Sequence, residues 1–160
     1  MKSICRFPVA AVVLFFSISP AGYCGEKITE RVINEEGGRK LIIVMKETGD
    51  FKNSVLEKVI NNYSGTCRIE VKNRKYLRNL NDAGYDAVLI IETLKAWTFF
   101  NKKALKAARG NDRVVLFFTS GDPDFTYNKK GVDAVSAASD RADPGKTAEE
   151  IISRLDGILK

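Results

Sequence analysis

The sequence predicts a three-layer α/β/α sandwich in which helices cover both faces of a five-stranded parallel sheet. Three short runs are apolar on both faces, as strands buried inside a parallel sheet are: Lys40–Met45, Tyr85–Ile91 and Arg113–Thr119. Segments with helical spacing of apolar residues separate these runs, which is the pattern of β-α-β units. The 160 residues, of which 44% are hydrophobic, suffice for one domain with a substantial core.

The first β-α unit begins with a strand at Lys40–Met45, and Thr48–Asp50 supplies the turn after it. A helix follows, because apolar residues then recur at helical spacing. These residues are Val55, Leu56, Val59, Ile60 and Tyr63. Ser64 and Gly65 end the helix.

The second strand, Cys67–Lys72, has a different pattern, because apolar and charged residues alternate along it. One of its faces is therefore predicted to lie in water, and we place the strand at an edge of the sheet. A short helix is expected at Lys75–Leu80. The central strand, Tyr85–Ile91, follows, and it contains no polar residue apart from Asp86 near its start.

The second half of the chain is predicted to hold a helix at Phe100–Arg109, a buried strand at Arg113–Thr119 and a loop at Ser120–Lys130. Val132–Ala138 is a weaker strand of small residues, which suits the opposite edge of the sheet. Asp143 and Pro144 begin the last helix, with an acceptor side chain and then proline in the first turn. Its buried stripe comprises Ala148, Ile151, Ile152, Leu155, Ile158 and Leu159.

The predicted strand order is 2-1-3-4-5. Crossovers between parallel strands are right-handed, and the chain must cover both faces of the sheet. This order meets both conditions and places the alternating second strand and the weak fifth strand at the two edges. Residues 39–160 are predicted to form this domain.

Residues 1–24 have the layout of a secretory signal peptide. Lys2 and Arg6 give a positive start, Pro8–Ile18 is apolar, and Ser19–Gly22 ends the apolar run. The run is short for a bilayer span. We therefore expect cleavage after Gly22 or Cys24 and export to the periplasm or the extracellular space, with an uncleaved membrane anchor as the alternative.

Residues 25–38 are polar and are expected to form a linker or loose extension, in which Ile28, Val32 and Ile33 lay one short turn on the domain. Cys24 stands where bacterial lipoproteins carry their modified cysteine. The residue before it is the bulky Tyr23, where a small residue is normal, so lipidation is not favoured. Contact with the membrane is expected only through the N-terminal signal or a lipid at Cys24.

The charge of the chain is modest and well mixed. The full chain has 26 basic and 20 acidic residues, and loss of Lys2 and Arg6 with the signal leaves a net charge of +4. Charges of both signs are mixed along the chain, as on a solvated surface, and no nucleic-acid motif is present. We expect no nucleic-acid partner.

Histidine is absent, which excludes Ser-His-Asp and Cys-His catalytic arrangements and histidine metal sites. The three cysteines, Cys5, Cys24 and Cys67, have no metal-ligand spacing, and no metal site is predicted from them. In an exported protein Cys24 and Cys67 either pair or leave Cys67 as a lone thiol.

The predicted order brings three loops to one rim of the sheet: Lys46–Asn53, Glu92–Trp97 and Ser120–Tyr127. Ligands of such sheets bind at this rim, beyond the carboxyl ends of the strands. Here the chain after the signal resembles the flavodoxins, which carry a T-x-T-G-x-T loop around the phosphate of FMN at a helix N-terminus. The segment Glu47–Phe51 keeps the Thr-Gly step at Thr48 and Gly49 but lacks the flanking hydroxyl groups.

The resemblance implies an FMN site. Backbone amides of Thr48, Gly49, Asp50, Phe51 and Lys52 would hold the phosphate, although the carboxylates of Glu47 and Asp50 would repel it. The segment Gly121, Asp122 and Tyr127 resembles the flavodoxin loop whose tyrosine stacks on the flavin ring, and Trp97 stands where another aromatic residue often stacks. The alternatives are that Trp97 packs on the sheet and that Tyr127 is a packed loop residue.

Five acidic residues are expected near the same rim: Glu47, Asp50, Glu92, Asp122 and Asp124. Facing one cleft, they would bind a divalent cation or a basic partner. The alternative is that they are solvated loop residues with lysines nearby. A response-regulator receiver has the same topology, but Glu92 stands where it needs aspartate and Ser136–Ser139 has no lysine, so we set that interpretation aside.

The functional prediction is an exported flavodoxin-like domain that binds FMN and carries electrons to a redox or protein partner. The alternative is a flavin-free binding or interaction module with no catalytic activity of its own. An independent enzyme has the least support, because no histidine, activated nucleophile pair or metal motif is present.

Overall fold

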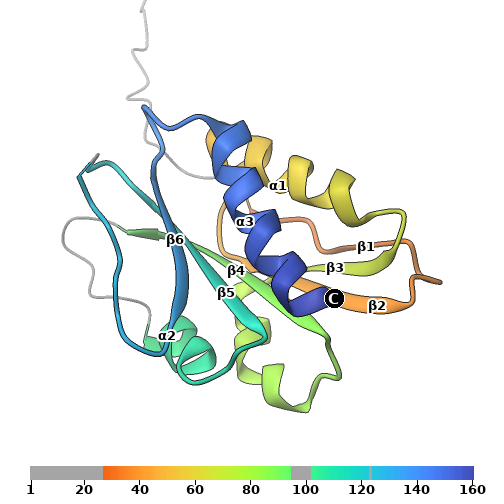
Figure 1. Ribbon diagram of the computed structural model, residues 1–160. Helices are drawn as coiled ribbons and strands as arrows, with labels where there is room; N and C mark the ends of the chain where they lie inside the picture. Colours follow the sequence, from red (N-terminus) through yellow and green to blue (C-terminus); the bar gives the residue numbers. More distant parts are fainter. Residues whose placement is uncertain (1–26, 95–101, 123) are drawn as a thin grey trace, which may run out of the picture.

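The computed structural model describes residues 27–94, 102–122 and 124–160, which form a six-stranded sheet with helices on both faces (Figure 1). The strands are β1 (Arg31–Ile33), β2 (Arg39–Met45), β3 (Cys67–Asn73), β4 (Ala87–Leu94), β5 (Val114–Ser120) and β6 (Asp133–Ala138). The helices are α1 (Asp50–Tyr63), α2 (Lys102–Ala108), α3 (Pro144–Leu159) and the 3-10 turns η1 (Arg74–Arg78) and η2 (Leu80–Asp82). Within these ranges, no helix combines the length and the apolar character that a membrane span requires.

The strands lie in the order β1-β3-β2-β4-β5-β6. The last five are the predicted strands in the predicted order, and each pairs in parallel with its neighbour. This order is that of the flavodoxin-like α/β class, which is therefore confirmed.

Two details of the predicted sheet are wrong: the number of strands and the position of the second strand. The structure adds β1, which pairs antiparallel with β3 and matches Arg31 with Val71, Val32 with Glu70 and Ile33 with Ile69. The sheet is therefore mixed, and β3 lies inside it with β1 at the edge. The alternating pattern of β3 shows only that one face of the strand is exposed to water. An interior strand has the same pattern when no helix covers that face, so the pattern does not prove an edge position.

Specific contacts hold β1, which belongs to the segment expected to be a linker or extension. Ile33 packs against the main core, and Arg31 forms an ion pair with Glu57 of α1. The turn from β1 to β2 passes close to β3, where a Cβ on Gly37 would lie 2.1 Å from the backbone nitrogen of Arg68. Only glycine fits at this position.

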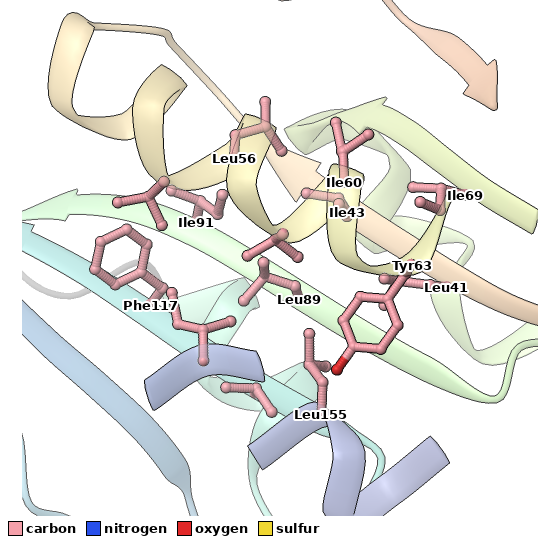
Figure 2. Close-up of a cluster of buried hydrophobic side chains, with 14 of the residues drawn as sticks. Leu41, Ile43, Leu56, Ile60, Tyr63, Ile69, Leu89, Ile91, Phe117 and Leu155 are labelled. Atoms are coloured by element: carbon pink, nitrogen blue, oxygen red, sulfur yellow. The ribbon is translucent and has the colours of Figure 1, made fainter. Parts of the chain in front are cut away.

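The face of the sheet under α1 and α3 holds one large apolar cluster (Figures 1 and 2). Its centre is formed by Leu89 and Ile91 of β4 and Phe117 of β5, none of which is more than 2% exposed. Helices α1 and α3 cover this cluster on the side away from the sheet. The labelled residues around the centre are Leu41, Ile43, Leu56, Ile60, Tyr63, Ile69 and Leu155.

The opposite face is covered by α2, η1 and η2. Their buried residues, Ala104, Ala108, Leu77 and Leu80, pack on strands β2, β4 and β5. The strand residues of this second cluster are Ile42, Val44, Val88, Ile90, Val114, Leu116 and Phe118. No residue of β3 belongs to the cluster in the described part of the chain, which leaves the outer face of β3 to charged side chains.

The expectation that Ile28, Val32 and Ile33 lay one short turn on the domain is wrong, because Val32 and Ile33 belong to β1 and Val32 is 38% exposed. The predicted cap of the last helix agrees with the structure. Asp143 caps α3, with its Oδ1 accepting hydrogen bonds from the backbone N–H groups of Gly145 at 2.6 Å and Lys146 at 3.2 Å. The described part of the loop Ser120–Lys130 contains no helix. Cys67 is a buried free thiol, while Cys24 lies outside the described residues, so its pairing stays a prediction.

Helices α1 and α3 are joined by Tyr63, which is 5% exposed. Its hydroxyl group lies 2.7 Å from Asp156 Oδ1 and 3.1 Å from the carbonyl oxygen of Ile152. Burial, followed by the hydrogen bond to Asp156, raises the pKa of Tyr63 well above its ordinary value of 10.0. The neutral phenol is thus the form that the folded protein favours.

We predict that the Leu89→Ala substitution lowers the free energy of unfolding by about 2–5 kcal/mol, because it leaves a cavity in the centre of the main core. Urea denaturation measures this change. The control is Asn61→Ala on the exposed side of α1, for which we expect a change within about 0.5 kcal/mol. Equal effects of the two substitutions would show that the core around Leu89 is wrongly assigned.

We also predict an alkaline loss of stability that depends on Tyr63. A raised folded-state pKa means that the stabilisation is complete below the unfolded-state pKa of about 10 and declines as the pH rises above it. The free energy of unfolding of the wild type should therefore fall more steeply above pH ~10 than that of Tyr63→Phe. Parallel pH profiles of the two proteins would contradict this assignment.

Candidate functional site

A pocket of about 370 Å³ opens at the carboxyl edge of the sheet, where β2, β4 and β5 end. Its volume lies within the range of roughly 300–1,000 Å³ that is typical of small-molecule sites. The lining comes from the loop after β2, the first turn of α1, the ends of β4 and β5, and the segment after β6. The lining residues are Glu47, Thr48, Gly49, Asp50, Phe51, Lys52, Thr93, Thr119, Ser139 and Asp140.

The N-terminus of α1 forms one wall of the pocket. Gly49 is the N-cap residue, and among the described residues no side-chain hydrogen bond caps the helix there. The first N–H groups of a helix have no carbonyl partner within the helix and carry the positive end of its dipole. This wall therefore favours an anionic or hydrogen-bond-accepting group of a ligand.

Lys52 lies on the floor of the pocket and is only 9% exposed. Its ammonium group donates a hydrogen bond of 2.9 Å to Thr93 Oγ1 at the end of β4. Thr119 Oγ1, at the end of β5, lies 3.4 Å from Thr93 Oγ1. The floor therefore combines one buried positive charge with two neighbouring hydroxyl groups.

Three acidic residues also line the pocket: Glu47, Asp50 and Asp140. Asp50 and Asp140 are exposed, and Glu47 lies 3.6 Å from the ammonium group of Lys46. Among the described lining residues there are three carboxylates and one ammonium group, so an anionic ligand would be attracted by Lys52 and repelled by the carboxylates.

The structure brings together five of the predicted site residues, Thr48 to Lys52, all of which line this pocket. The ring of Phe51 also packs against the core, 6.4 Å from the ring of Phe117. The first loop was thus predicted at the place where the structure has a pocket.

The other predicted site residues lie elsewhere. Gly121 and Asp122 are exposed and do not line this pocket. Tyr127 packs with its ring 4.9 Å from that of Phe118, and it lines a different pocket of about 420 Å³ beside β6 and α3. Burial raises the pKa of Tyr127. Trp97 lies outside the described residues.

Four lining residues were not predicted as site residues: Thr93, Thr119, Ser139 and Asp140. Thr93 and Thr119 are direct cross-strand partners of β4 and β5. The sequence held a usable signal for this pair, because Thr119 ends one predicted buried strand, Thr93 follows the other by two residues, and the two strands were predicted to be neighbours. Ser139 and Asp140 follow β6 and had no comparable signal.

Of the two interpretations of the five acidic residues, the one in which all of them face one cleft is wrong. Only Glu47 and Asp50 of the five line the pocket, while Glu92 pairs with Arg74 at 3.3 Å. Asp122 Oδ1 instead accepts a hydrogen bond from the backbone N–H of Asp124 at 3.0 Å. Within the described ranges, no group of three or more acidic or cysteine side chains is placed to hold a metal ion.

The comparisons with known proteins support the fold alone. A lysine decarboxylase of Francisella novicida matches with a TM-score of 0.51 and 12% identity, covering 76% of this chain and 17% of the decarboxylase. The chain thus spans about a sixth of that protein's length. Oxidised Flavodoxin 2 of Bacillus cereus matches with a TM-score of 0.47 and 7% identity, covering 74% and 98% of the two chains.

A flavodoxin from the domain Archaea matches with a TM-score of 0.44 and 12% identity, covering 76% of this chain and 99% of the flavodoxin. No protein-family model and no curated protein matches the sequence. The flavodoxin-like class therefore rests on the strand order of the sheet, and the activity must be inferred from the pocket.

We predict that Thr93→Val lowers the free energy of unfolding by about 1–2 kcal/mol, because the buried ammonium group of Lys52 loses a hydrogen-bond acceptor. The same substitution in a Lys52→Met background should cost less, because no ammonium group is left to satisfy. Urea denaturation of the four proteins in this cycle measures the coupling. Thr66→Val at an exposed turn is the matched control, and additive effects in the cycle would contradict the Lys52–Thr93 interaction.

Proposed function

We propose that this flavodoxin-like domain binds a small ligand in the pocket at the carboxyl edge, that FMN is the leading candidate, and that the loaded protein carries electrons. The observation that supports this most is Lys52, a residue of the first turn of α1 that lines the pocket and is only 9% exposed. A buried cation close to helix amide groups and hydroxyl groups attracts a phosphate or a similar anion.

The phosphate end of FMN fits the residues of the pocket. Lys52 would offer its ammonium group, Thr93 its hydroxyl group and the first turn of α1 its amides. The described residues offer no predicted aromatic partner for the flavin ring, because Tyr127 packs on Phe118 and Trp97 lies outside the described residues. When bound, FMN supplies one-electron or hydride-level redox chemistry.

The acidic residues of the lining set the expected strength of binding. Glu47 and Asp50 would oppose the negative charge of the phosphate, whereas Lys52 lies where the charge is least screened by water. We therefore expect weak FMN binding.

A flavin-free binding or interaction module is the second candidate. Two observations favour it: Tyr127 is packed away from the pocket, and three carboxylates line the pocket. In this case the pocket would accept a neutral or cationic ligand, and the protein would act through its surfaces.

We further propose that the protein works in an exported compartment, with a redox or protein partner there. This rests on the positive, apolar and small-residue regions of residues 1–24. A protease-protection assay on intact cells tests the location: degradation of the protein by added protease would support export, and protection until lysis would oppose it.

We predict that the fluorescence of FMN is quenched when it binds the wild type, and that FMN raises the melting temperature of the wild type. Lys52→Met should weaken the affinity for FMN about tenfold, because a charge-assisted contact to the phosphate is lost. Titration of FMN fluorescence measures the affinity. The control is Lys58→Met, which changes an exposed lysine of the same helix and should leave the affinity unchanged.

Each outcome separates the candidates. Equal affinity of the wild type and Lys52→Met would place the flavin outside the pocket. No response of the wild type at high FMN would retire the electron-transfer proposal and favour the flavin-free module.

A further inference from the structure

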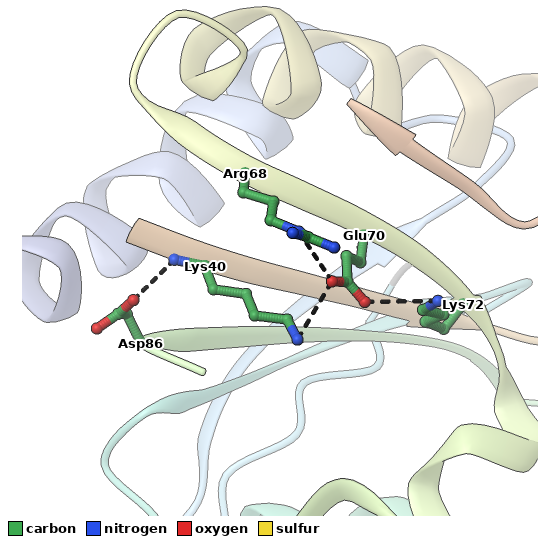
Figure 3. Close-up of polar contacts among 5 residues, drawn as sticks. All are labelled: Lys40, Arg68, Glu70, Lys72 and Asp86. Carbon is green, nitrogen blue, oxygen red and sulfur yellow. Dashed lines mark hydrogen bonds and ion pairs between the residues drawn. The ribbon is translucent and has the colours of Figure 1, made fainter. Parts of the chain in front are cut away.

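On the face of the sheet opposite α1 and α3, neighbouring residues of β1, β2 and β3 form a compact group of four charged side chains and one exposed apolar side chain. We call this group, which comprises Val32, Lys40, Arg68, Glu70 and Lys72, the β3 strip. Figure 3 shows Lys40, Arg68 and Lys72 converging on Glu70 from β2 and β3. The strip lies where the apolar cluster under α2 and η1 ends.

Glu70 is the centre of the β3 strip, with a side chain only 7% exposed. Its Oε1 atom lies 3.2 Å from Lys40 Nζ and 3.1 Å from Arg68 Nε, and its Oε2 atom lies 3.4 Å from Lys72 Nζ. Burial opposes ionisation of Glu70, but the hydrogen bond and charge of Lys40, followed by Lys72, lower its pKa. One carboxylate therefore holds three cations, which leaves a surplus of two positive charges among these four residues. The carboxylate of Asp86, whose Oδ2 accepts a hydrogen bond from the backbone N–H of Lys40 at 2.7 Å, lies beside them and offsets part of this surplus.

The cations keep donors for a further acceptor. An ammonium group has three N–H donors and a guanidinium group has five, while Glu70 uses one contact from each of the three side chains. The side chains of Arg68, Lys40 and Lys72 remain 42%, 30% and 21% exposed. Part of each of these side chains is therefore accessible to a partner.

The cations are also held in place before any partner arrives. Glu70 fixes their head groups, and Lys72 Nζ lies 5.6 Å from the centre of the Tyr76 ring. Ordering long, flexible side chains is a main cost of forming an interface. Part of this cost is already met within the folded protein.

Val32 adds an apolar contact to the β3 strip. It is the one large hydrophobic side chain that is exposed in the described part of the chain, at 38%. Because Val32 and Glu70 are direct cross-strand partners, their side chains lie on the same face of the sheet. An exposed apolar residue beside a surplus of cations is a surface suited to a partner that brings both carboxylates and an apolar side chain.

We propose that the β3 strip docks an acidic segment of a partner protein, with partner carboxylates on Lys40, Arg68 and Lys72 and an apolar partner side chain on Val32. The proposal is independent of the ligand in the pocket, because none of these residues lines it.

The pattern of charges favours a protein over a nucleic acid. Sequence-independent nucleic-acid binding needs a basic track along the phosphate backbone. Here the cations surround a carboxylate, and the next cation along the face, Arg74, is paired with Glu92 at 3.3 Å. Such a surface suits a short protein segment with a few neighbouring carboxylates better than a continuous phosphate backbone.

The experiment measures fluorescence anisotropy of a dye-labelled peptide of alternating glutamate and valine, titrated with the full protein. Lys40→Gln/Lys72→Gln removes two cations and leaves Arg68 paired with Glu70, and it should weaken binding about tenfold. The control, Lys129→Gln/Lys130→Gln, changes two exposed lysines of a distant loop by the same net charge and should leave binding unchanged. Val32→Ser retains every charge and should weaken binding about threefold.

Several results would overturn the proposal: absence of peptide binding by the wild type, equal loss in the strip and control variants, or binding that does not weaken with added salt. Tighter strip-dependent binding of oligothymidylate or of phosphatidylserine vesicles would replace the protein partner with a nucleic acid or a membrane. Melting curves of the variants verify folding, and Val32→Ser alone decides the case if the double variant does not fold.

Discussion

The burial of β4 on both faces is the constraint on which the rest of the structure depends. Val88, Leu89, Ile90 and Ile91 are at most 2% exposed, so this strand needs a neighbour on each side and helices above and below. Strands β2 and β5 supply the neighbours, and right-handed crossovers then distribute the helices over the two faces. Parallel pairing brings the carboxyl ends of all three strands to one edge, where the pocket forms.

Helices cover the two faces of the sheet unequally, and this inequality explains why β3 carries charged side chains on one face. On one face, α1 and α3 lie side by side over the sheet and share one apolar core with it (Figure 1). On the other, the described helical segments cover β2, β4 and β5, while β3 carries Arg68, Glu70 and Lys72. A buried carboxylate is tolerated there because three cations surround it, whereas an unpaired one would be costly.

The candidate site was predictable in its position and only partly in its composition. The Thr-Gly turn between a buried strand and an amphipathic helix located the first loop, because local sequence determines such turns. That Lys52 points inward to Thr93 depends on residues 41 positions apart in the chain. Tyr127 lies in a loop whose sequence resembles the ring-stacking loop of flavodoxins, but its ring packs against Phe118 of β5.

The sequence by itself determined the α/β class and the cap of α3, because hydrophobic periodicity and capping chemistry act over a few neighbouring residues. The order of the five parallel strands followed from this pattern together with the right-handedness of crossovers. Only the tertiary structure decided that Arg31–Ile33 pairs with β3, that β3 is interior, and that the side chain of Lys52 reaches Thr93. These features depend on strand register and on which helix covers which face. Both result from contacts between residues far apart in the chain, which leave no local pattern.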